Sequence, residues 1–159
     1  MKYLLILILT LGSLASQAQQ LHTTFPEDFN RWKFEGENFN TVFHDGFDRW
    51  TYDRLTIQTV FMNDWNNWKI GSDVRLKTAF TNSFNHWKIE GLGQSVSVQT
   101  TFHGNYTQWN ITGDVEGSFR CVFINDWERW EFDLSFDEVS KEIRAALLFI
   151  AIHTSIKKH

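Results

Sequence analysis

The chain lacks the cysteines that hold many small exported proteins together. Only one is present, Cys121, in 159 residues. A single cysteine cannot form an intramolecular disulfide, so stability has to come from side-chain packing. Aromatic residues can provide that packing, because large rings bury much apolar area and they make up 16% of the chain, with 8 Trp and 15 Phe.

Clusters of basic residues and membrane-length apolar runs are also missing. The formal net charge is −4, and the Lys and Arg residues are scattered along the chain. Affinity for nucleic acid comes mainly from neutralising phosphates, so we expect no nucleic-acid partner. A membrane-spanning helix needs about 20 apolar residues, and no run here reaches that length, so we do not expect the chain to span a membrane.

The first 18 residues are typical of a secretory signal peptide. Lys2 gives a positive start, residues 3–11 are apolar apart from one Thr, and Ser16-Gln17-Ala18 is a small-x-small cleavage sequence. We predict cleavage near Ala18 and a mature chain that begins near Gln19. The protein is then expected to be secreted, periplasmic or at the cell surface.

Six octets, each beginning with Phe and ending with Trp, recur along the chain. We number their positions 1 to 8. Position 5 is always aromatic, and the second residue after the Trp is always large and apolar. Repetition at intervals of about 20 residues indicates a repeat architecture. The octets are residues 25–32, 43–50, 61–68, 80–87, 102–109 and 123–130.

The residues before each octet alternate between apolar and polar, which predicts strands with one buried face. In Leu55 to Phe61, for example, every second residue is apolar or Thr. Pairing Phe61 with Trp68 places the two apolar faces on the same side of a hairpin, with residues 63–66 as its loop. We therefore expect Phe and Trp of each octet to touch on an inner face, a contact worth up to about 1 kcal/mol.

Residues 19–134 are thus predicted to form an all-β, antiparallel, up-and-down meander of about 12 short strands, curled or closed into a barrel. Residues 135–159 are predicted to form an amphipathic helix in the same domain, packed in or against the aromatic face. Ser135 to Glu138 resembles a capping box, and apolar residues follow at helical spacing. A β-solenoid is the alternative, disfavoured because its narrow interior would be overfilled and the gaps between octets vary.

No catalytic motif is found, so we expect no enzyme, no cofactor and no metal site. HExxH, CxxC, GxSxG and phosphate-loop patterns are absent. His44 and His103 share position 2, but the other octets place Pro, Met, Thr and Ile there, which does not suit a ligand or catalytic role. Cys121 alternates with Phe119 and Phe123 and is expected to be a small core residue.

The octet loops are the candidate binding site, because side-chain oxygens beside aromatic rings suit sugar recognition. Calcium is a second ligand that such oxygens could bind, and Asn and Asp also favour turns for backbone reasons alone. The candidate residues are Asp45, Phe47, Asp48, Asn63, Asp64, Trp65, Asn66, Asn125, Asp126 and Trp127.

The sequence favours a secreted, non-catalytic repeat protein that binds glycans or another cell-surface partner, or adheres to them. One alternative is a structural or assembly protein of the cell envelope with no small ligand. A second is a carrier of apolar ligands, with the helix as plug. Exposure of the position 5 rings separates these hypotheses, because a row of exposed rings favours binding and buried rings favour a scaffold.

Overall fold

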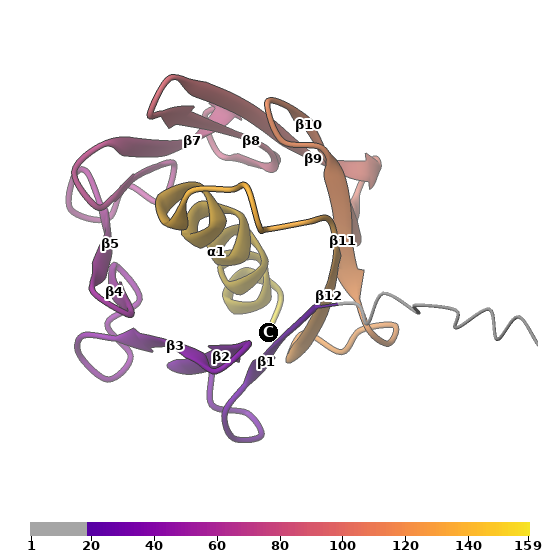
Figure 1. Cartoon of the computed structure of the whole chain (residues 1–159). Coiled ribbons are helices and arrows are strands. Elements are labelled where there is room, and N and C mark those ends of the chain that lie inside the picture. Colours follow the sequence, from indigo (N-terminus) through magenta and orange to yellow (C-terminus); the bar gives the residue numbers. More distant parts are fainter. Residues whose placement is uncertain (1–18) are drawn as a thin grey trace, which may run out of the picture.

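Twelve antiparallel strands follow one another in chain order around a closed barrel in the computed structural model, which describes residues 19–159 (Figure 1). Strand β1 closes the barrel by pairing with β12, and α1 runs through the interior. The predicted meander, its closure and its C-terminal helix are confirmed, and the solenoid is excluded. The predicted signal peptide, residues 1–18, lies outside the described residues.

The elements are β1 (Gln19–Thr23), β2 (Arg31–Phe34), β3 (Glu37–Thr41), β4 (Arg49–Tyr52), β5 (Leu55–Thr59), β6 (Asn67–Ile70), β7 (Val74–Phe80), β8 (Ser83–Gly91), β9 (Gln94–Phe102), β10 (Asn105–Gly113), β11 (Gly117–Cys121), β12 (Arg129–Asp133) and α1 (Lys141–Lys158).

All six octets form hairpin connections at one end of the barrel, which we term the octet end. The predicted register is wrong by two residues: Thr59, not Phe61, lies opposite Trp68. The hairpin closes where Val60 N donates to Asn67 O at 2.9 Å, so the loop has six residues rather than the four at 63–66. A shift of two keeps each side chain on the same face, which is why the inward residues of the strands were predicted correctly.

The predicted contact between Phe and Trp of each octet is also wrong. All six Trp at position 8 are 0% exposed, whereas the six Phe at position 1 are 51–69% exposed. In four octets the chain leaves the sheet before position 1; for example, Phe61 O already accepts a turn hydrogen bond from Asp64 N at 3.1 Å. In octets 80–87 and 102–109, register shifts interrupt the pairing next to the turn instead. Strand alternation therefore does not extend to the Phe.

The true partner of each Trp is the aromatic residue three positions before it. The rings at positions 5 and 8 lie 5.9–6.2 Å apart in all six octets. In five octets the indole Nε1 also donates to the position 5 carbonyl at 2.8–3.1 Å. The sixth indole, of Trp130, donates instead to Ser155 Oγ of α1 at 2.9 Å. The octet is thus a loop tied by its own indole.

A small residue faces each buried Trp across the hairpin and leaves room for the indole. It is Thr in five hairpins and Cys121 opposite Trp130 in the sixth. Cys121 is 7% exposed, as predicted for a core residue. Burial, with a further contribution from Asp126, raises the pKa of its thiol to about 12, so it is not a reactive thiolate.

Helix α1 fills an interior too wide for side chains alone. Eight strands give a barrel that side chains can fill, whereas twelve strands tilted by about 40° enclose a space roughly 24 Å across. A helix about 11 Å wide leaves roughly 6 Å on each side for inward Trp, Phe and Ile side chains. Accordingly, Ile143 and residues 145–155 are buried all round the helix. No helix within residues 19–159 is long and apolar enough to cross a membrane.

The N-cap of α1 lies five residues after Ser135, the first residue of the predicted capping box. Ser140 is the N-cap, and its Oγ accepts from Ile143 N at 3.2 Å. The box at 135–138 does not form because Phe136 is buried against Phe34 and Phe132, with ring centroids 5.3 and 5.8 Å apart. This segment carries the chain from the barrel wall into the interior.

Contacts with the wall hold α1 at its first turn, at its middle and, through Ser155 and Trp130, near its C-terminal end. Lys141 pairs with Asp53, and Arg144 pairs with Glu37 at 3.1 Å, at the end opposite the octets. In the middle of the barrel, the Phe149 ring lies 4.6 Å from that of Trp68. The helix therefore has one axial position, with its C-terminus at the octet end.

Single substitutions at the first and last residues of one octet test which of the two rings stabilises the fold. Trp68→Phe removes the indole donor to the Trp65 carbonyl and leaves a cavity, so the free energy of unfolding should fall by roughly 2–4 kcal/mol. Phe61→Ala, at an exposed position, should change it by less than about 0.5 kcal/mol. Urea unfolding of both variants measures the two effects; equal losses would contradict the observed register.

Candidate binding site at the octet end

Backbone geometry accounts for the Asn and Asp residues at position 3 of the octets. This position is left-handed in every octet, with φ between 58° and 62° in five and 75° at Gly104. Asn, Asp and Gly tolerate that conformation better than other residues. The candidate residues Asp45, Asn63 and Asn125 all occupy it. Their residue type is therefore a turn requirement, whatever else their side chains contact.

Carboxylates at position 4 close the loops from within. Asp64 Oδ1 accepts from Asn66 N at 3.0 Å, and Asp64 Oδ2 accepts from Asn67 Nδ2 at 2.6 Å. The bond from Asn67 is the main cause that holds the pKa of Asp64 below its ordinary value. Asp126 bonds Glu128 N and Arg129 in the same way. These oxygens are occupied, and no cluster of His, Cys, Asp or Glu within residues 19–159 is placed to hold a metal ion.

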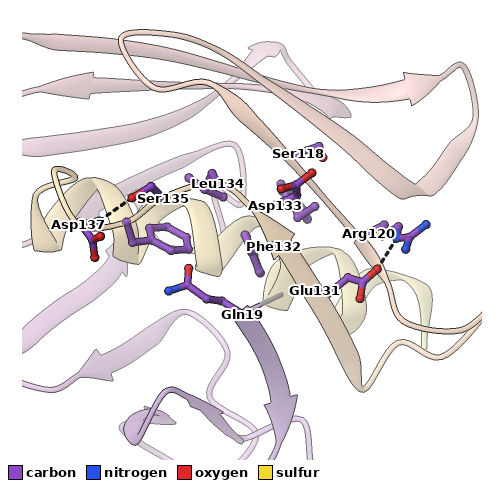
Figure 2. Close-up of a pocket in the computed structure, with 11 residues that line it drawn as sticks. Gln19, Ser118, Arg120, Glu131, Phe132, Asp133, Leu134, Ser135 and Asp137 are labelled. Atoms are coloured by element: carbon purple, nitrogen blue, oxygen red, sulfur yellow. Dashed lines mark hydrogen bonds and ion pairs between the residues drawn. The ribbon is translucent and has the colours of Figure 1, made fainter. Parts of the chain in front are cut away.

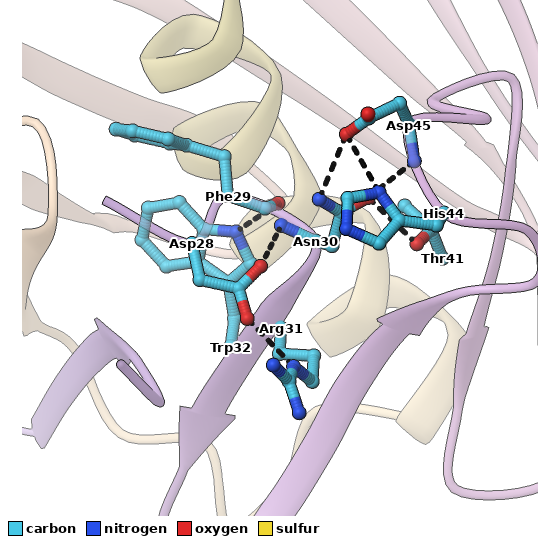
Figure 3. Close-up of polar contacts among 8 residues, drawn as sticks. All are labelled: Asp28, Phe29, Asn30, Arg31, Trp32, Thr41, His44 and Asp45. Atoms are coloured by element: carbon cyan, nitrogen blue, oxygen red, sulfur yellow. Dashed lines mark hydrogen bonds and ion pairs between the residues drawn. The ribbon is translucent and has the colours of Figure 1, made fainter. Parts of the chain in front are cut away.

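The side chain at position 6 joins neighbouring hairpins. Figure 3 shows the first junction, where Asn30 Oδ1 accepts from Asp45 N at 2.7 Å and from Thr41 Oγ1 at 3.0 Å. The candidate residue Asn66 has this structural role as well. A third junction of this kind connects the last hairpin to the first, so three of the six neighbouring pairs of loops are joined. The three junctions, at 2.6–2.7 Å, are Asn30 with Asp45 N, Asn66 with Asn82 N, and Glu128 with Glu27 N.

The position 5 rings line the inside of the octet end rather than standing free. Phe29 is buried, and the other five are half-buried and pack against the core. The candidate rings Phe47, Trp65 and Trp127 therefore cover the buried indoles of their own octets. This placement is the one expected of scaffold residues.

The octet end does have a row of exposed aromatic rings, but these rings belong to the Phe residues at position 1 and not to the residues at position 5. Met62 and Ile124, at position 2, add exposed fractions of 88% and 90%. Of the eleven exposed large apolar side chains in residues 19–159, ten lie at the octet end, and Leu92 alone lies at the other. We term the six rings the Phe rim: Phe25, Phe43, Phe61, Phe80, Phe102 and Phe123.

Three rings of the Phe rim, those of Phe25, Phe80 and Phe123, lie near the outward side chain at position 7 of their own octet. Arg31 Cζ lies 4.7 Å from the centre of the Phe25 ring, and Arg129 Cζ lies 5.4 Å from that of Phe123. Because position 7 precedes an inward Trp, it faces outward, and the rim rings lie on the outer side of the loops. The sequence did contain a signal for the outward placement of the position 1 Phe residues. Turn-forming residues at positions 3 and 4 indicate that position 1 directly precedes a turn.

Basic side chains from the end of α1 occupy the space inside the loops. Lys157 Nζ lies 4.2 Å from the Trp65 ring centre, and Lys158 Nζ lies 3.7 Å from that of Tyr106. His153, one turn before Lys157, is buried among aromatic rings and was not predicted to be a site residue. Beside it is a cavity of about 170 Å³, lined by Phe84, Tyr106, His153, Thr154, Lys157 and Lys158.

A larger hollow, of about 810 Å³, lies at the opposite end of the barrel (Figure 2). It is an open groove between the end of β12 and the start of β1, lined mainly by polar side chains such as Asp133 and Asp137. Two of them, Arg120 and Glu131, pair with each other. None of the predicted site residues lies in this groove.

Acid unfolding should report the buried imidazole. Burial, with a smaller repulsion from Lys157, lowers the pKa of His153 from 6.5 to about 3. Between these values the unfolded chain binds more protons, so the free energy of unfolding should fall as the pH drops below 6.5. The slope from this group approaches about 1.4 kcal/mol per pH unit.

Urea unfolding at several pH values between 7 and 4.5 measures that slope. His153→Leu should make the slope shallower than that of the wild type, and His103→Gln, at an exposed position, is the control substitution. The interval lies above pH 3.8, where the lowered pKa of Asp64 begins to matter. Equal slopes for the wild type and His153→Leu would contradict the assignment.

Comparison with known proteins adds no assignment to this geometry. No protein-family model, no curated protein and no solved structure gives a significant match to the chain. The function is therefore argued from the octet end itself.

Proposed function

We propose that the chain is a non-catalytic protein that adheres to glycans through the Phe rim. The observation that carries the proposal is that ten of the eleven exposed large apolar side chains in residues 19–159 lie at one end of the barrel. Large exposed apolar patches mark surfaces that a partner covers. The same residue type at position 1 of all six octets has no role in the core, so packing does not account for it.

Glycans suit the chemistry of the rim. A ring that packs on its position 7 neighbour still offers its other face, and an aromatic face can stack on the apolar face of a pyranose. The side chains of Asp48, Asn63 and Asn125 take no part in the loop hydrogen bonds described above and are available to sugar hydroxyls. The proposed site thus still combines aromatic rings with polar side chains, as predicted, but the rings are those at position 1 instead of position 5.

Six copies of the contact make a multivalent surface. Each octet offers one ring, and a polymer that reaches two octets gains affinity without any new type of contact. A repeating polysaccharide fits such a surface better than a single small sugar. Export of the protein, which this role requires, rests on residues 1–18 and stays a prediction.

The two alternative functions have less support. Assembly through sheet edges needs an unpaired strand, and within residues 19–159 every strand is paired on both sides. Transport of an apolar ligand needs an apolar cavity of about 300 Å³ or more. Helix α1 leaves about 170 Å³ at the octet end, and the larger hollow of about 810 Å³ at the other end is lined mainly by polar side chains. Association of two octet ends remains a role that the rim could serve.

Removal of rim rings should abolish glycan binding without unfolding the barrel. In Phe61→Ala/Phe123→Ala, each lost ring should reduce the binding free energy by about 1 kcal/mol or more, so affinity should fall at least tenfold. Leu92→Ala is the matched control, because it removes an exposed apolar side chain, 49% exposed, at the other end. A glycan array followed by titration calorimetry measures the effect.

Two outcomes would contradict this proposal. One is the absence of any glycan binding by residues 19–159. The other is binding that the rim variant and the Leu92 control retain equally. Sedimentation of the same proteins tests self-association: a dimer that Phe61→Ala/Phe123→Ala dissolves would assign the rim to assembly.

A further inference from the structure

The cavity inside the loops has a polar side chain with unmet hydrogen-bonding capacity. His153 is 1% exposed, and neither of its ring nitrogens has a hydrogen-bond partner among residues 19–159. Trp65, Trp87 and Phe84 surround it, with ring centres 4.9–5.3 Å away. A buried polar group without a partner is destabilising, so an apolar residue would serve packing better here. The imidazole therefore calls for a role beyond packing.

Two ammonium groups give the cavity its charge. Lys157 and Lys158 both line it, and each lies over an aromatic ring, with no ion-pair partner among residues 19–159. The C-terminal end of a helix carries only about half a negative charge, which two ammonium groups exceed. His159 lies on the far side of the ring of loops, its imidazole 4.4 Å from the Phe29 ring. The cavity thus has two positively charged ammonium groups beside the neutral imidazole of His153, which can donate a hydrogen bond.

We propose that this cavity binds the carboxylate of a small acid. Lys157 and Lys158 would face its charge, and the neutral imidazole of His153 would donate its N–H to a carboxylate oxygen. The volume of about 170 Å³ equals that of roughly five or six waters, enough for a carboxylate and a few attached carbons. The half-buried Phe84 and Tyr106 rings would contact those carbons.

The carboxylate can come from a free acid or from a sugar acid in a polysaccharide. The contacts of the cavity support the carboxylate alone; its assignment to a sugar acid rests on the proposed function. The two surfaces are concentric, because the cavity lies inside the loops and the Phe rim outside them. A uronic acid residue of a polymer held by the rim could therefore place its carboxylate in the cavity.

Calorimetric titration with sodium glucuronate, and with glucose as the uncharged analogue, tests the site. The wild type should bind glucuronate and not glucose. Lys157→Gln/Lys158→Gln should lower the affinity for glucuronate at least tenfold. Lys69→Gln/Lys88→Gln, which removes the same charge from the outward face of β6 and β8, should leave it unchanged. Sodium acetate and a polyuronate, titrated in parallel, distinguish a simple carboxylate from a polymer-bound one.

A second readout reports the imidazole directly. The ring-nitrogen NMR signals of His153 should shift on addition of glucuronate, and those of His103 should not. His153→Leu should keep the fold and lose at least threefold in affinity. Phe61→Ala/Phe123→Ala should bind the monomer as the wild type does, because the rim lies outside the cavity.

The inference is overturned if glucuronate does not bind, if glucose binds equally well, or if the two lysine variants behave alike. In each of those cases, rim-dependent binding of an uncharged glycan would still leave the proposed function standing. Conversely, rim variants that change no polymer binding, alongside lysine-dependent binding of glucuronate, would keep the carboxylate site and remove the proposed function.

Discussion

The hydrogen bond from an indole to the carbonyl three residues before it is the interaction on which the structure depends. It sets the interval between the two inner aromatic positions and turns the loop back on the strand that follows. It also lets an indole be buried without an unmet donor, which would otherwise be costly. Five octets make this bond within themselves, and the sixth makes its equivalent to Ser155 of the helix. The repeat is therefore a repeat of loops, and the strands between them can vary.

The number of strands and the presence of the helix depend on each other. Six hairpins close into a barrel too wide to be filled by side chains alone, and one helix has the diameter that makes up the difference. The helix is correspondingly apolar around its whole circumference, apart from the groups that meet the wall at its two ends. Neither part has a complete core without the other, so we expect barrel and helix to unfold together.

The sequence was sufficient for the fold but not for the site. Alternation and the fixed interval predicted the hairpins, the inward residues of the strands, a meander curled or closed into a barrel, and the helix. The register was missed because strand alternation was extended into Phe61, where the chain had already turned. The site was misplaced for the same reason: the position 5 rings were candidates for exposure, and the position 1 rings were placed in the core. His153 was missed because its role depends on residues from several hairpins, which only the closed barrel brings together.

The position of α1 after all twelve strands has a consequence for biogenesis. A ribosome completes every hairpin before it makes the segment that fills the barrel. Until then, six indoles on the inner face have no covering and no Ser155 to meet Trp130. We therefore expect the emerging chain to stay open with its inner aromatic face exposed, a state that a holding chaperone would protect from aggregation. Synthesis of the helix would then allow the barrel to close around it, with β1 paired to β12.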